Sequence, residues 1–197
     1  MAKSDPASSK KERNKTIRWV LTVFLATIVV SGTISFVSEE IMSVSSMAVS
    51  FLILFAIVLI GIVFDIIGVA VTSADEKPFH SMAARRVPGS QEAIRLLRNA
   101  ERVSSICNDV VGDICGVVSG AASATIAAQV LQKFSFSFPQ LAVLLMSALV
   151  SGLTVGGKAI GKTFAIGSCT KIVHNTGKVI GGVHNFFSGW RKENKDS

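Results

Sequence analysis

The chain has 197 residues, of which 49% are hydrophobic and only 17% charged, and its formal net charge is +7. A soluble domain can be equally apolar, but it would not collect its charges in the connections between long apolar stretches, as this chain does. This placement of the charges therefore excludes an ordinary soluble domain, and the length of the chain leaves no room for a second globular one. We expect an all-α integral membrane protein with four transmembrane helices and cytoplasmic juxtamembrane amphipathic helices.

Each of four apolar stretches is long enough to cross a bilayer, since about 20 helical residues span a hydrocarbon core of about 30 Å. The stretches are Ile17–Val37, Met47–Val71, Ser105–Val130 and Leu141–Ile160. The first could instead be a cleaved signal peptide, because basic residues precede it. Its apolar run is longer than that of a typical signal peptide, however, and no Ala-x-Ala-like site follows. We therefore expect it to be retained as an additional transmembrane helix over residues 17–37.

The basic residues predict the orientation. Of the 20 Lys and Arg, 19 lie before or at the start of the first span, between the second and third, or from the end of the fourth onward. Four crossings place all of these on one side of the membrane. Because cytoplasmic connections are enriched in Lys and Arg, both termini and the middle loop are expected to be cytoplasmic.

The cytoplasmic segments divide into helical and disordered parts. Ser90–Val103 and residues 166–190 show apolar side chains at a spacing of three to four residues beside basic ones, which is typical of helices that lie among anionic lipid headgroups. Residues 1–16 and 191–197 are charged and poor in apolar side chains, so we expect them to be disordered. We expect no nucleic-acid partner and no organic cofactor.

Small residues recur at every fourth position of the third span, beginning with Gly112, Gly116 and Gly120. Such a row lets another helix approach closely, because dispersion and weak Cα–H contacts replace the hydrophobic effect inside lipid. The row predicts a tight seam, either within the chain or between two protomers of a homodimer.

Ionisable residues interrupt the apolar spans at one depth. Asp65 lies in the second span, and Asn108, Asp109 and Asp113 lie near the start of the third. Charges inside a bilayer normally face a bundle interior or a cavity and mark a functional site. Carboxylate and amide oxygens suit Mg²⁺, which makes these four residues a candidate metal site. Lys158, in the fourth span, offers the other interpretation, in which its ammonium pairs with an aspartate and blocks the site.

Three motifs resemble the transmembrane domain of the CNNM/CorC (CorB) family, which is associated with magnesium transport. Residues 64–73 read F-D-I-I-G-V-A-V-T-S, similar to the family's F-S-x-S-E-x-A-L-T-S. Cys107-Asn108 stands where the family has G-N, and residues 157–165 resemble its G-E-I-x-P-K-T-x-A. The resemblance covers residues 47–165 and the amphipathic tail. It implies a protein that binds or transports divalent cations in the plasma membrane of a bacterium.

The departures from the family pattern fall on its polar residues. The family's serines correspond to Asp65 and Ile67, and its first glutamate to Gly68. The glutamate of its last motif is Lys158, and the proline is Gly161. Only Asn108 is kept from the polar set that the resemblance implies for the cation. No cytoplasmic nucleotide-binding CBS pair is expected, because the chain ends soon after the tail.

Two functions from different classes stay open at this point. In the first, the protein binds or transports Mg²⁺ through Asp65, Asn108, Asp109 and Asp113. In the second, it is a non-transporting scaffold or accessory subunit, in which Lys158 neutralises the former cation site. We do not expect an enzyme, since the sequence has no H-E-x-x-H and no G-x-S-x-G motif.

Overall fold

The computed structural model describes residues 6–134 and 138–193, and all of its regular elements in these ranges are helices. In chain order they are α1 (Pro6–Val44), α2 (Met47–Ser73), α3 (Lys77–Ala84), α4 (Ser90–Arg98), α5 (Ala100–Ser105), the π-helix η1 (Ile106–Gly112), α6 (Asp113–Lys133), α7 (Pro139–Gly167) and α8 (Cys169–Glu193). Four helical segments of the described chain are long and apolar enough to cross a membrane: Ile17–Met42, Met47–Ser73, Ala100–Lys133 and Pro139–Gly167. The predicted all-α fold with four membrane-length helices is confirmed.

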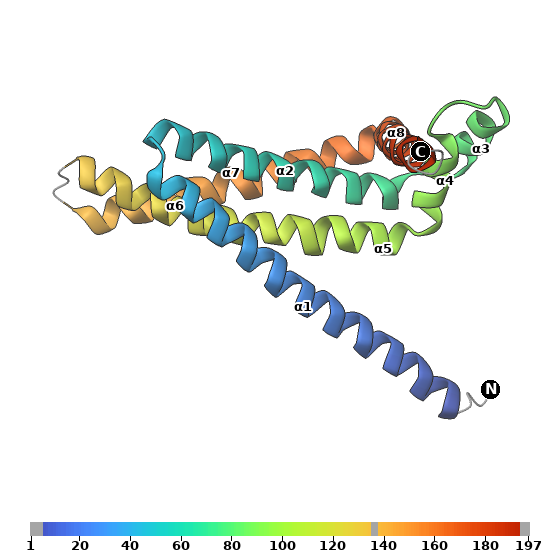
Figure 1. Cartoon of the computed structure of the whole chain (residues 1–197), viewed down its shortest axis with the longest axis horizontal. Helices are drawn as coiled ribbons and strands as arrows, with labels where there is room; N and C mark the ends of the chain where they lie inside the picture. The colour runs from blue at the N-terminus through green and yellow to red at the C-terminus, as the bar shows by residue number, and fades with distance from the viewer. Residues whose placement is uncertain (1–5, 135–137, 194–197) are drawn as a thin grey trace.

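Three of these helices form a bundle and the first leaves it. Helices α2, α6 and α7 lie side by side, while α1 touches the bundle only near its own C-terminal end and then diverges (Figure 1). At that contact Met42 is fully buried, and its carbonyl accepts a hydrogen bond of 2.7 Å from the Gln129 side chain of α6. Over the membrane-length window of α1, by contrast, no residue is buried.

The apolar interior has two separate parts. One lies beside the end of α1 and joins α1, α2 and α6: Met42, Leu54, Val58, Ala122, Ile126 and Val130. The other lies where α3, α4 and α8 cover the end of α2: Ala70, Val71, Phe79, Ala93, Leu97, Ala165 and Val173. We call the second region the basic end, because the connections there carry most of the Lys and Arg. Between the two parts, the bundle interior holds polar groups.

Helix α8 crosses the bundle at the basic end, and its axis is seen nearly end-on in Figure 1. It packs tightly on the start of α4, with Gly177 against Gly89 and Ala93, and Val173 is fully buried there. Val179, Ile180 and Val183 are exposed. A helix with one packed face and one exposed apolar face, lying across the ends of spans, suits the plane of the lipid headgroups.

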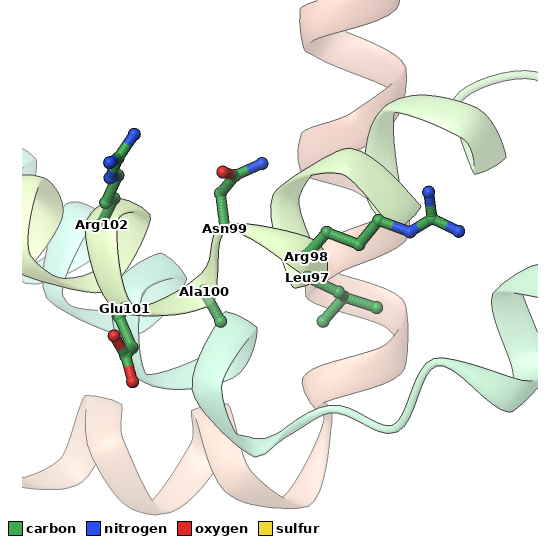
Figure 2. A pocket seen from close by; sticks show the side chains of 6 residues that line it. All are labelled: Leu97, Arg98, Asn99, Ala100, Glu101 and Arg102. Atoms are coloured by element: carbon green, nitrogen blue, oxygen red, sulfur yellow. The ribbon is translucent and has the colours of Figure 1, made fainter. Parts of the chain in front are cut away.

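The predicted helix Ser90–Val103 is in fact two helices, and this prediction was wrong in its continuity. The chain bends at Asn99, where the backbone has φ −116° and ψ 29°. The Asn99 side chain donates a hydrogen bond of 2.9 Å to the carbonyl of Arg95 and thereby competes with the helical backbone. Figure 2 shows the bend: Arg98 and Arg102, on either side of it, extend in different directions.

The N-terminal segment also differs from its prediction of disorder over residues 1–16. Helix α1 begins at Pro6 and runs without interruption into the first span. Extending an existing helix avoids the unfavourable nucleation step, and Lys, Glu and Arg are good helix formers. Residues 1–5 and 194–197 lie outside the described part of the chain. At the other end, residues 191–193 continue α8.

Candidate functional site

Asp65 occupies the polar layer between the two apolar regions. It lies in the most apolar of the four membrane-length helices, and only 4% of its surface is exposed. Eight residues separate it from Ser73, which ends α2 at the basic end, so the carboxylate lies about 12 Å along the helix from that end. A charge at this depth requires compensation by other polar groups.

Two lysines of α7 provide positive charge near this carboxylate. The Nζ atom of Lys162 lies 3.9 Å from Oδ2 of Asp65, which is an ion pair without a hydrogen bond. The Nζ atom of Lys158 donates a hydrogen bond of 3.2 Å to the carbonyl of Gly112. A Cβ atom on Gly112 would lie 3.3 Å from Lys158 Nζ and 3.6 Å from Oδ1 of Asp65. The ammonium and the carboxylate therefore flank the same glycine.

Asn108 supplies a second buried oxygen, on the same face of α2 as Asp65. Its Nδ2 donates to Oγ of Ser104 at 3.1 Å, while its Oδ1 is buried and has no hydrogen-bond partner among the described residues. The amide lies so close to Gly68 that a Cβ atom there would collide with Oδ1. Gly68 is one helical turn from Asp65, so the Asn108 amide and the Asp65 carboxylate lie along the same face of α2, and each has one buried oxygen without a hydrogen-bond donor among the described residues.

The predicted set of four metal ligands is divided by the structure. Asp65 and Asn108 come together in the interior, but Asp109 and Asp113 are exposed on the outer side of η1 and α6. The reason is helical periodicity: Cys107 and Gly112 face the interior, and the carboxylates between and after them turn outward. Within the described residues, no three His, Cys, Asp or Glu side chains lie together as a metal site.

The π-helical segment η1 contains Asn108 and ends at Gly112. A π-helix replaces i to i+4 hydrogen bonds with i to i+5 bonds, and such segments are frequent at functional sites. Here it carries the Asn108 amide, which lies against Gly68, and the Gly112 carbonyl, which accepts the hydrogen bond from Lys158. We call Asp65, Asn108, Gly112, Lys158 and Lys162 the buried polar cluster, of which Lys162 is the exposed outer member.

Sequence reasoning missed Lys162, which was assigned only to the basic flank. A usable signal was present, because Lys162 follows Lys158 by four residues and therefore shares its face of α7. The contact between Gly68 and Asn108 was also missed. The absence of a side chain at Gly68, where the resembling family has glutamate, was the only hint of it.

The predicted glycine row is packed at one end and open along the rest. Gly112 is enclosed by the buried polar cluster, but no atom lies within 4 Å of a Cβ built on Gly116 or Gly120. Both line a groove of about 210 Å³ between α6 and α7, together with Ser119, Val150, Ser151, Thr154, Val155 and Lys158. The row therefore does not form a seam inside the described chain beyond Gly112.

The chain matches no family model, no curated protein and no solved structure. The likeness to the CNNM/CorC transmembrane domain thus stands on the three sequence motifs, and two of these carry the residues of the buried polar cluster that α2 and α7 contribute.

Proposed function

We propose that this membrane protein binds a divalent cation, Mg²⁺ by its chemistry, at Asp65 and Asn108, as part of a transport function like that of the CNNM/CorC proteins it resembles. The observation that carries the proposal is that two buried oxygens, Oδ2 of Asp65 and Oδ1 of Asn108, have no hydrogen-bond donor in the described part of the chain. An unsatisfied acceptor inside a membrane protein is costly, and an oxygen-seeking cation would satisfy both.

The two lysines fit this proposal as competitors for the cation. With Asp65 ionised, the lysines already leave the buried polar cluster with an excess of positive charge. A bound cation would therefore raise the local charge further unless an ammonium moved away. The Lys162 side chain is 53% exposed and can leave towards the basic end. Lys158 has a buried partner in the Gly112 carbonyl, so its departure would be the more costly step.

The alternative function is a scaffold or accessory subunit that transports nothing. The observation in its favour is the same hydrogen bond between Lys158 and Gly112, because a lysine held at the site by the backbone can replace the cation permanently. In that case Asp65, Lys158 and Lys162 serve only to join α2, η1 and α7. Removing one partner would then lower stability, since the other charge is left buried.

Thermal unfolding of the purified protein in detergent, with and without millimolar Mg²⁺, separates the two functions. If a cation site exists, Mg²⁺ raises the midpoint saturably, because a ligand that binds the folded state stabilises it. Asp65→Asn should abolish this rise, whereas Asp109→Asn, an outward-facing control on the same level, should keep it. If the wild-type midpoint does not respond to Mg²⁺ and the protein carries no Mg²⁺ flux in liposomes, the scaffold function is the one that holds.

A further inference from the structure

Two carboxylates of this membrane protein face outward from its bundle at membrane depth. Asp109 and Asp113 are exposed, and Asp113 follows Gly112, which lies level with Asp65 about 12 Å inside the end of α2. A carboxylate facing acyl chains there is strongly unfavourable, so side chains of this kind face protein or water. Another polypeptide or a polar cavity must therefore cover this face.

The surface beside these carboxylates is shaped to receive a helix. Asp113, Gly116 and Gly120 share one stripe of α6, and the two glycines border the open groove against α7. Without side chains to hold it off, a helix backbone can approach such a surface closely.

Over the membrane-length window of α1 no residue is buried, so most of this helix has no packing partner within the described chain. This helix cannot cover the groove of its own bundle. It is attached to α6 at Gln129 and beside Ile126, and Gln129 is nine residues from Gly120, which places it on the opposite side of the helix at 100° per residue. The short α1–α2 connection, residues 45–46, keeps it there.

We propose that the groove between α6 and α7, with Asp109 and Asp113 at its basic end, binds helix α1 of a second copy of this chain. Charge complementarity selects this occupant. Arg18 is exposed near the start of the α1 span, and it lies on the same side of the membrane as Asp109 because α1 and α6 run in the same direction.

The depths of the two groups also agree. The hydrogen bond between Gln129 and the Met42 carbonyl defines a common level on α6 and α1. From that level, Asp109 lies about 30 Å and Arg18 about 36 Å along their helices. The divergence of α1 from the bundle (Figure 1) shortens the second distance when it is projected on the bundle axis. A long arginine side chain spans the remaining difference.

Disulfide cross-linking between two differently tagged copies tests the proposal. In a background with Cys107, Cys115 and Cys169 replaced by alanine, one copy carries Val29→Cys and the other Val117→Cys. Val29 lies on the Arg18 side of α1, and both residues are exposed at about 18–20 Å from the common level. We expect oxidation to give the heterodimer. A copy with Ile160→Cys, exposed on α7 away from the groove, should give none with Val29→Cys.

A charge reversal extends the same experiment. Arg18→Glu should remove most of the cross-link, and Asp109→Lys with Asp113→Lys in the other copy should restore it. Absence of the heterodimer, an equal yield with the Ile160→Cys control, or insensitivity to Arg18→Glu would each overturn the proposal. Val29→Cys and Val117→Cys can also be placed on one chain. An internal disulfide in that double variant would show that α1 packs on its own bundle, and this result would overturn the proposal as well.

Discussion

Lys158 donates a hydrogen bond of 3.2 Å to the carbonyl of Gly112, and this bond joins α7 to the π-helical segment of the third span. It holds the ammonium beside Gly112, where the Asp65 carboxylate also lies. A Cβ atom on Gly112 would crowd the ammonium, because the two would lie only 3.3 Å apart. Every functional interpretation of the interior depends on whether this ammonium stays or leaves.

Replacing Lys158 by glutamate should convert the site from one that holds an ammonium to one that binds Mg²⁺ more strongly. The change removes an ammonium and adds a carboxylate opposite Asp65, so without a cation two carboxylates repel each other and the midpoint of unfolding should fall. Millimolar Mg²⁺ should then raise the midpoint by more than it does in the wild type. Lys158→Met is the matched control, since it removes the ammonium without adding a ligand. A glutamate variant that unfolds alike with and without Mg²⁺ would contradict a cation geometry at this position.

Asp65→Leu should be more destabilising than Asp65→Asn. Leucine leaves the buried end of Lys158 without a nearby carboxylate and adds a branched side chain, whereas asparagine keeps the shape and one oxygen. Loss of a buried charge partner costs about 3–5 kcal/mol, and a neutral polar replacement costs less. Equilibrium unfolding in mixed detergent measures both variants. Equal stabilities would mean that the charge of Asp65 is not compensated by the lysines.

Gly68→Ala should destabilise the fold by about 1–3 kcal/mol, since the new methyl group collides with the Asn108 amide and overpacks the interior. Gly152→Ala is the control on an exposed face, where a Cβ meets no atom within 4 Å. There, alanine should stabilise the helix by up to about 1 kcal/mol, because it loses less conformational freedom than glycine. The two variants are compared by thermal unfolding, and a similar effect at both positions would argue against the Asn108 contact.

Cysteine accessibility tests the predicted orientation. The exposed residues Ser81 and Gln140 lie at opposite ends of the bundle, in α3 and at the start of α7. In intact cells, an impermeant thiol reagent should label Gln140→Cys and should label Ser81→Cys only after the membrane is opened. The reason is the collection of basic residues at the Ser81 end. The reverse labelling pattern would mean that the protein has the opposite orientation in the membrane.

The sequence by itself determined the four membrane-length helices and the depth of the polar residues along them. Both follow from counting residues in a regular helix, because hydropathy marks the span and each residue adds a fixed rise. Asp65, Asn108 and Lys158 were recognised in this way as groups at similar depth. The basic amphipathic tail was recognised too, from its spacing alone.

Only the tertiary structure decided in which direction each side chain points. The rotation of a helix about its axis is set by its packing against neighbours, and in the third span it is also set by the π-helical turns, which no hydropathy pattern reveals. Asp109 and Asp113 consequently face outward although they lie level with Asp65. Lys162 reaches the Asp65 carboxylate for the same reason, since it shares with Lys158 the face of α7 that meets α2.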